Sequence, residues 1–74
     1  MAKKDKVTVK HELTGEKAEL DNKIEKLKRF TLSVDFTKLS RQQMSAMHRQ
    51  LAAMESYSVA LRDRIIDITS QESE

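Results

Sequence analysis

Residues 40–69 read SRQQMSAMHRQLAAMESYSVALRDRIIDIT, and this stretch decides the fold. One set of residues recurs in it at spacings of three and four without a slip, as on one face of an amphipathic helix. The set consists of Met44, Met47, Leu51, Met54, Ser58, Leu61, Ile65 and Ile68, of which Ser58 alone is polar. Ser40 and Gln43 form a capping box of the S-x-x-Q kind, which marks a helix start. The pattern predicts a helix over about residues 41–68.

A second, weaker stripe of the same period lies upstream of the first. It consists of Leu20, Ile24, Leu27, Thr31 and Val34. Thr14 is a favourable N-cap residue, and Glu16 follows it in the first turn, where the helix dipole favours an anion. These features predict a helix over about residues 15–33. The periodicity lapses between Ser33 and Leu39, and the side chains there favour a turn.

A short connection between two amphipathic helices makes them antiparallel neighbours. We therefore expect an all-α fold in which residues 14–69 form an antiparallel two-helix hairpin. Residues 1–13 form a basic N-terminal leader, and the β-branched run VTV at residues 7–9 predicts that this leader is extended. Residues 70–74 are polar, and we expect them to fray.

Composition excludes several classes of protein. The 74 residues contain no cysteine, no proline and one glycine. Disulfide scaffolds and thiolate metal sites are therefore excluded, and a β-sandwich is disfavoured because its tight turns need glycine and proline. No apolar run approaches the ~20 residues of a membrane span, and the first residues lack the apolar stretch of a signal peptide. We expect a helical protein of the cytoplasm.

The expected core is marginal for a single chain. A chain of this length buries roughly 60% of its unfolded surface. The long predicted helix carries a second row beside the first, formed by Ala46, Ala53, Tyr57 and Ala60. A helix with so wide an apolar face packs on more than one neighbour, which predicts a homo-oligomer. The alternatives are a loosely folded monomer and a chain that folds only on a different protein.

Catalytic constellations are not visible in the sequence. His11 and His48 stand alone, without the carboxylates or second histidine that a helical metal site needs. There is no cysteine nucleophile, and a single glycine, Gly15, cannot form a glycine-rich phosphate loop. We expect a protein that is not an enzyme, with no catalytic residue, no metal site and no cofactor.

Phosphate binding is the chemistry that the charge pattern favours most. Residues 23–29, KIEKLKR, carry four cations against one anion. Lys26 and Arg29 share a helix face and could clamp one phosphate, and Phe30 could supply an apolar or stacking wall. The alternative is a lysine-rich face that is simply solvated.

Lys10 and His11 form a second candidate site just before the first predicted helix. Unpaired amide donors at a helix N-terminus bind anions, and His11 could stack on a base or be an ordinary surface residue. Because fifteen residues separate His11 from Lys26, the two lie more than about 20 Å apart along one helix. If both bind one small ligand, the pocket must lie between two protomers.

Three strings carry a resemblance to a known family: HELTGE at residues 11–16, LDNKI at residues 20–24, and QLxxMxxYxxxLxxRI at residues 50–65. In them the chain resembles the bacteriophage anti-CBASS protein two family. These small helical hairpins act as sponges that sequester the cyclic oligonucleotide signals of bacterial immunity. The resemblance covers roughly residues 10–66, nearly the whole hairpin.

The resemblance implies compact homohexamers that hold cyclic dinucleotides where two protomers meet. In that family an aromatic residue of the leader stacks on a base, and a basic residue of the first helix holds phosphate. Those roles fall here on His11 and Lys26, although this chain has Lys10-His11 where a large aromatic is expected. A separate pocket for cyclic trinucleotides would involve Thr8, Ser58 and Arg62. Alternatively, Ser58 is a polar break in the helix seam and Arg62 a surface charge.

Three functions compete on this basis. The first is a phage-encoded sponge that binds cyclic dinucleotides, and cyclic trinucleotides as well, in the host bacterial cytoplasm without cleaving them, and so blocks CBASS-type signalling. The second is a helical adaptor or regulatory protein that binds a host or phage protein through its long helix. The third is binding to RNA or DNA through the lysine-rich leader, which a net charge of only +2 makes the least favoured.

Overall fold

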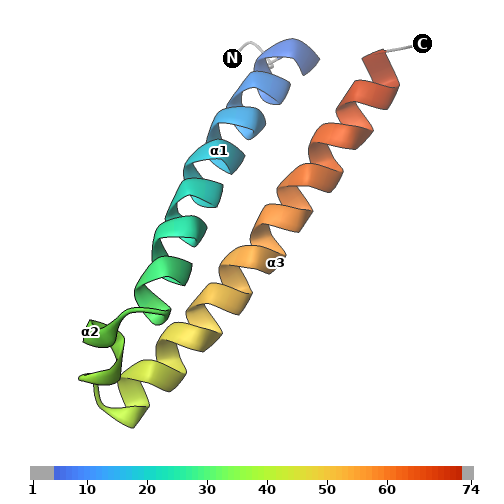
Figure 1. Cartoon of the computed structure of the whole chain (residues 1–74). Coiled ribbons are helices and arrows are strands. Elements are labelled where there is room, and N and C mark those ends of the chain that lie inside the picture. The colour runs from blue at the N-terminus through green and yellow to red at the C-terminus, as the bar shows by residue number, and fades with distance from the viewer. Residues whose placement is uncertain (1–4, 73–74) are drawn as a thin grey trace, which may run out of the picture.

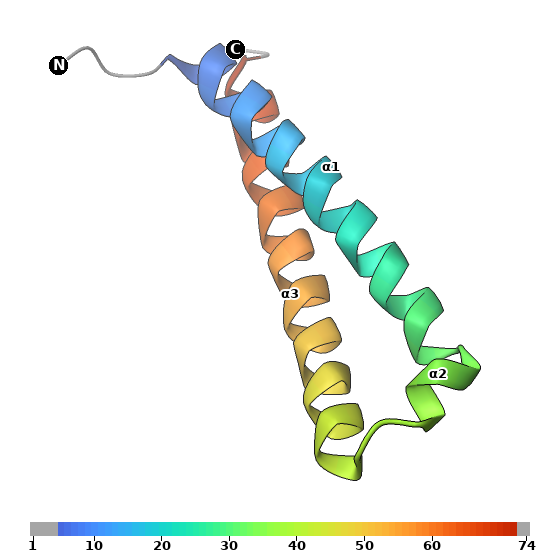
Figure 2. The same cartoon turned by 90° about the vertical axis from the view of Figure 1, so that its left-hand side faces the viewer.

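The computed structural model describes residues 5–72, and all regular structure within them is helical. The helices are α1 (Lys6–Thr31), α2 (Val34–Thr37) and α3 (Arg41–Glu72). Figures 1 and 2 show α1 and α3 side by side in opposite directions, with the short α2 at the end where they are joined. The expected all-α class is confirmed over the described residues. Residues 1–4 of the predicted leader and 73–74 of the predicted tail lie outside them.

The first helix begins much earlier than the sequence predicted. Asp5 is its N-cap, and the Asp5 carboxylate accepts a 2.7 Å hydrogen bond from the backbone N–H of Thr8. The prediction of an extended leader is therefore wrong for residues 6–13. The β-branched residues there lower helix propensity by only about half a kcal/mol each. Leu13 is buried against the rest of the chain at 4% exposure, and burying a leucine contributes about 1.5–3 kcal/mol, which outweighs that propensity.

Thr14 and Gly15 lie inside α1 rather than at its start. The hydroxyl of Thr14 donates a 2.8 Å hydrogen bond to the carbonyl oxygen of Lys10, one turn back, so Thr14 does not cap the helix. Gly15 has ordinary helical backbone angles, and a methyl group in place of its hydrogen would meet nothing within 4 Å. The glycine is therefore not required by the conformation or the packing of the single chain.

Replacing Gly15 with alanine is expected to stabilise the helix pair. A glycine inside a helix is less favourable than alanine by about 0.5–1 kcal/mol, because its unfolded backbone has more freedom to lose. Urea unfolding of Gly15→Ala should show a rise of that size in the free energy of unfolding. A fall would mean that another surface approaches α1 at Gly15 so closely that a methyl group does not fit.

The predicted turn between the long helices contains the single-turn helix α2. Ser33 is its N-cap: the hydroxyl accepts from the backbone N–H of Phe36 at 3.3 Å and donates to the carbonyl oxygen of Phe30 at 2.6 Å. The ring of Phe36 is buried and meets Phe30 and His48 edge to face, with centroid distances of 6.1 and 5.3 Å. The connection is thus anchored to both long helices by one aromatic cluster.

The long helix follows its sequence pattern closely. The backbone N–H of Gln43 donates a 3.1 Å hydrogen bond to the Ser40 hydroxyl, which confirms the predicted helix start. All eight positions of the predicted stripe are buried or half-buried, and Leu61 is completely buried. The helix continues to Glu72, four residues beyond the predicted end, so residues 70–72 are helical and not a separate tail.

A polar cluster interrupts the apolar seam between α1 and α3. Lys17 Nζ lies 2.6 Å from Asp21 Oδ2 and 3.1 Å from the Ser58 hydroxyl, which in turn donates a hydrogen bond to Asp21 Oδ1 at 2.5 Å. Ser58 is the buried polar residue of the described chain, and each of its hydrogen-bonding groups is satisfied. Because a buried hydroxyl without a partner is unfavourable, the cluster favours the helix alignment that brings Ser58 beside Asp21.

The stability of the helix pair should therefore fall in acid. The hydrogen bonds from Lys17 and from Ser58 lower the pKa of Asp21 below its ordinary value in the folded chain. A carboxyl with a depressed folded pKa contributes stability that is complete above its unfolded pKa, about 4, and is lost as the pH falls through the folded pKa. Urea midpoints at pH 7 and pH 3 should differ less in Asp21→Asn than in the unchanged protein. Equal pH dependence in both proteins would contradict this role.

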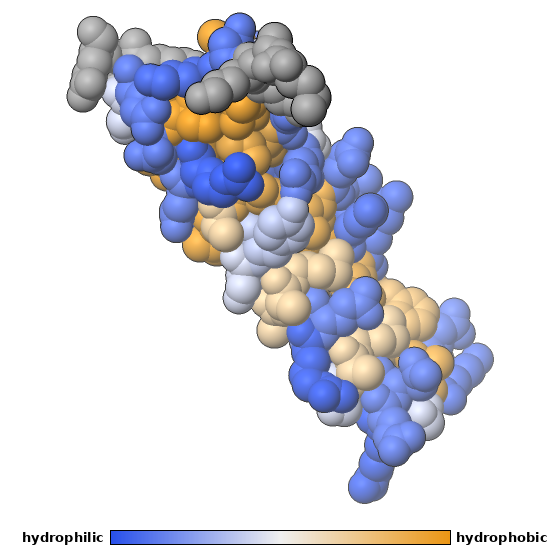
Figure 3. Space-filling view, turned by 180° about the vertical axis from the view of Figure 1, so that it is seen from behind, coloured by the Kyte–Doolittle hydropathy of each residue, from blue (hydrophilic) through white to orange (hydrophobic). Residues whose placement is uncertain are grey.

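The core formed by the two long helices is thin. Its buried apolar side chains are Leu13, Ile24, Phe36 and Leu61. Tyr57, Val59 and Ile66 on α3 are each about half exposed, at 48%, 46% and 54%, and Ala46, Ala53 and Ala60 are exposed as well. Figure 3 shows apolar side chains spread along one face of the molecule between polar side chains on both sides. The single chain leaves much of its apolar surface in contact with water.

Candidate functional site

The cationic side chains in the C-terminal half of α1 differ in whether they have a carboxylate partner. Lys28 Nζ lies 3.7 Å from Glu55 Oε2 of α3, and Arg29 Nε lies 3.6 Å from Glu25 Oε1, one turn back on α1. Lys23 and Lys26 have no such partner among the residues that the structure describes. Positive charge is therefore left unbalanced around Lys23 and Lys26.

These two lysines border a groove between the long helices, with a volume of about 400 Å³. We call it the Lys26 groove. Its lining residues are Lys23, Lys26, Leu27 and Phe30 of α1 and Met47, Gln50 and Met54 of α3. The volume lies within the range of about 300–1,000 Å³ that is usual for small-molecule sites. Both walls are parts of the two long helices, and the groove is shallow and open to solvent.

The groove combines an apolar floor with a cationic border. Phe30 offers an aromatic face, and Met47 and Met54 offer flexible, polarisable thioethers that adapt to flat rings. Lys23 and Lys26 offer ammonium groups, which form strong charge-assisted hydrogen bonds with phosphate oxygens. A ligand that suits both features carries an apolar ring and an anionic group on the same small molecule.

The structure brings together two of the residues that the sequence placed in a phosphate site, and separates the third. Lys26 and Phe30 both line the groove. Arg29 is 76% exposed, pairs with Glu25, and is not among the residues that line the groove. The predicted clamp of Lys26 and Arg29 is not formed by the groove itself and stays a prediction. Lys23, one turn before Lys26, lines the groove instead.

Lys10 and His11 lie at the opposite end of α1. Both are inside the helix, which begins at Lys6, so the predicted anion site at a helix N-terminus beside them is wrong. Their backbone N–H groups belong to the second turn, where the α-helical hydrogen-bond pattern occupies them. Fifteen residues of helix place His11 about 22 Å from Lys26 along α1. Within one chain His11 cannot contact a small ligand in the Lys26 groove.

The three residues of the proposed trinucleotide pocket do not form a common surface on the single chain. Ser58 is buried, and its hydroxyl binds Asp21 and Lys17 in the helix seam. Arg62 is exposed and pairs with its neighbour Asp63 at 3.2 Å. Thr8 is exposed in the first turn of α1. Ser58 therefore fits the alternative given above, a polar break in the seam.

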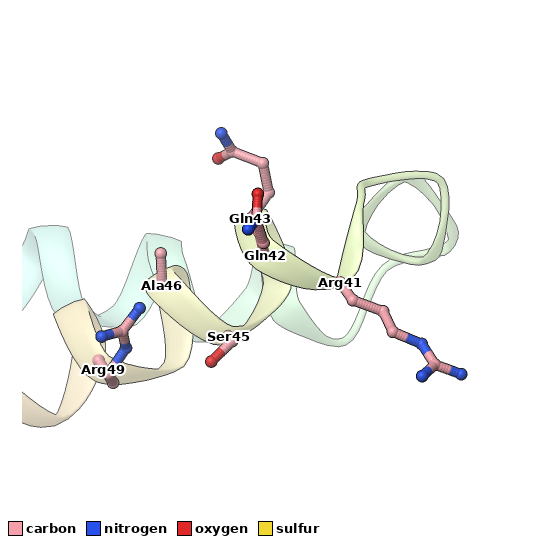
Figure 4. Close-up of a pocket in the computed structure, with 6 residues that line it drawn as sticks. All are labelled: Arg41, Gln42, Gln43, Ser45, Ala46 and Arg49. Carbon is pink, nitrogen blue, oxygen red and sulfur yellow. The ribbon is translucent and has the colours of Figure 1, made fainter.

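A second hollow lies on the outward side of α3, near its start. Its volume is about 490 Å³, larger than that of the Lys26 groove, and it is lined by Arg41, Gln42, Gln43, Ser45, Ala46 and Arg49. All six residues come from one helix, and Figure 4 shows Arg41 pointing away from Arg49. Because the two guanidinium groups do not converge, this surface is a weaker candidate than the groove.

Two searches for other kinds of site found nothing within residues 5–72. No group of three or more metal-ligating side chains comes together in the described part of the chain. None of its helices is both long enough and apolar enough to cross a membrane.

Comparison with protein families gives a match. The family model described as Sequestin matches residues 8–67, which is most of the chain. The chain belongs to the Sequestin family. The matched segment of this Sequestin chain contains every residue of the Lys26 groove as well as His11, Ser58 and Arg62. Searches of curated proteins and of solved structures found no significant match.

Sequence reasoning missed part of the groove of this Sequestin chain. The sequence placed Met47 and Met54 only in the helix seam, whereas both also border the groove. Lys23 could have been found, because it lies three residues before Lys26 and therefore on a neighbouring part of the same face. Gln50 belongs to one of the strings that carry the resemblance but received no role, because its place beside α1 depends on how the two helices align.

Proposed function

We propose that this chain is a sponge that binds cyclic dinucleotides in the Lys26 groove and releases them unchanged. The observation that carries the proposal is the groove itself, in which two lysines with no carboxylate partner among residues 5–72 border an aromatic and thioether floor. A cyclic dinucleotide has flat bases for that floor and two phosphates for the lysines. The name of the family denotes sequestration, which supports binding in place of catalysis.

The proposed binding site includes a second copy of the chain. The thin core and the exposed apolar row of α3 support a homo-oligomer of helical hairpins, a hexamer by the resemblance given above. In such an assembly the leader end of one copy, with Lys10 and His11, would close the Lys26 groove of another. The ligand would then be enclosed by two chains.

The biological setting follows from the resemblance to anti-CBASS sponges. The chain would act in the cytoplasm of a phage-infected bacterium, where it lowers the free concentration of the immune messenger. A sponge needs a long residence time and no turnover, and closure of the shallow groove by a second copy would lengthen that residence time. No metal and no cofactor takes part in this proposal.

The competing function is a helical adaptor for another protein. The half-exposed Tyr57, Val59 and Ile66 favour it, because large exposed apolar patches mark interaction surfaces. The adaptor predicts a chain that stays monomeric in sedimentation and takes up no nucleotide. The sponge predicts an oligomer that takes up nucleotide in proportion to the amount of protein.

The direct test is uptake and recovery of the ligand. The purified protein is mixed with cyclic di-AMP, cyclic di-GMP or cyclic tri-AMP, and the free nucleotide is measured by chromatography after filtration. The proposal predicts that at least one cyclic dinucleotide is depleted and returns intact when the protein is heat-denatured. A linear product would show an enzyme, and no depletion of any cyclic nucleotide would refute the sponge.

A further inference from the structure

Gln50 is the one uncharged hydrogen-bonding side chain that lines the Lys26 groove. Its carboxamide is exposed, and no group in the described part of the chain forms a hydrogen bond with it. The other lining side chains are two ammonium groups, a phenyl ring and three aliphatic or thioether groups. Lysines bind phosphates without regard to the base, and the apolar groups contact any flat ring. With Lys23 and Lys26 engaged by the phosphates, Gln50 is the lining side chain left to distinguish one base from another by hydrogen bonds.

The position of Gln50 suits that task. It lies three residues after Met47 and four before Met54, so the helical spacing places it on the same face as both thioethers. Lys23 and Lys26 line the groove from the facing helix. A base resting on the methionines would lie beside Gln50, with the two lysines on the facing helix.

The carboxamide favours one purine over the other. It offers an acceptor oxygen beside an N–H donor. Adenine offers the complementary pair on its N6–N7 edge, a donor and an acceptor, and glutamine binds that edge through two parallel hydrogen bonds. The corresponding edge of guanine offers two acceptors, O6 and N7, which arginine and lysine match better. Against guanine, the oxygen of Gln50 would face another acceptor.

We propose that Gln50 reads the base in the Lys26 groove and makes the site prefer adenine-containing cyclic nucleotides over guanine-containing ones. This inference rests on the proposed function, because it concerns the specificity of the same groove. A good two-bond contact with a base discriminates against the wrong base by roughly 5- to 150-fold in affinity.

The experiment compares cyclic di-AMP with cyclic di-GMP by titration calorimetry. The unchanged protein should bind cyclic di-AMP more tightly by a factor within that range. Gln50→Leu keeps a similar volume and loses the hydrogen bonds, so it should bind the two ligands about equally. Gln50→Arg supplies two donors to the guanine edge and should reverse the preference. Gln42→Leu, an exposed glutamine of the same helix outside the groove, is the matched control and should keep the original preference.

The outcomes separate this inference from the proposed function. Binding of both ligands with equal affinity by the unchanged protein overturns the role of Gln50 and leaves the sponge intact. An adenine preference that persists in Gln50→Leu also overturns it, because another group must then read the base. If no cyclic dinucleotide binds the unchanged protein, the sponge and the inference both fail.

Discussion

Leu61→Asp is expected to unfold the helix pair. Leu61 is fully buried, with 0% of its surface exposed, at a seam position of α3 facing α1. The aspartate would lose the apolar contacts, about 2–5 kcal/mol for a large-to-small change in a core, and would add an unpaired buried charge. Single domains have about 5–15 kcal/mol of total stability. Circular dichroism at 25 °C should show loss of most of the helical signal.

The matched control for this change is Ala52→Asp. Ala52 lies on the same helix, is exposed, and is outside both the predicted apolar row and the groove. It should keep the helical signal of the unchanged protein, and its free energy of unfolding in urea should change by no more than about half a kcal/mol. Leu61→Asp with a native helical signal and native urea midpoint would mean that the seam between α1 and α3 does not hold the chain together.

Lys26→Glu is expected to lower the affinity for a cyclic dinucleotide at least about a hundredfold. The lysine supplies a charge-assisted hydrogen bond, which contributes about 1.5–3 kcal/mol, and the glutamate would repel the phosphate in its place. Lys26 is exposed and has no partner among the described residues, so the fold should not change. Calorimetry gives the affinity, and the thermal midpoint verifies the fold.

Arg29→Glu separates the groove from a general effect of charge. It makes the same change in net charge three residues away on the same helix, at a side chain that does not line the groove. Its affinity should stay within a few fold of the unchanged protein. An equal loss in both variants would contradict the assignment of the site, because binding would then depend only on the total charge of α1.

The sequence was most informative along α3. Its eight-residue stripe and the Ser40 cap were both confirmed, because a long repeat sums many small preferences that all favour one helix face. The same reasoning located the turn at Ser33, which the structure shows as the N-cap of α2. These features are local or strictly periodic, so neighbouring residues are enough to determine them.

The predicted start of α1 was wrong because the interactions that decide it are not local. β-Branched residues at positions 7–9 argue for an extended chain, but α3 continues to Glu72 and lies beside that segment. Leu13 is buried in the folded chain, and the carboxylate of Asp5 caps the new helix start. Packing of α1 against α3 outweighs the weak preference of β-branched residues for an extended chain. That packing cannot be read from residues 7–9 alone.

The site was only partly predictable for a related reason. Lys26 and Phe30 could be chosen from charge pattern and spacing, and both line the groove. Arg29 could not be excluded, because its pairing with Glu25 depends on side-chain orientation. Gln50 could not be assigned to the site, since it lies 27 residues after Lys23 and the two line one groove only because of how α1 and α3 align.

The central claim is that a cyclic dinucleotide lies in the groove between α1 and α3. Methyl NMR of methionine-labelled protein during titration with cyclic di-AMP tests it most directly, because two of the four methionines line that groove. We predict saturable shifts of the Met47 and Met54 methyl signals with one common dissociation constant. Met44, in the same seam but outside the groove, should shift little. Binding confirmed by calorimetry that leaves Met47 and Met54 unmoved would contradict the claim.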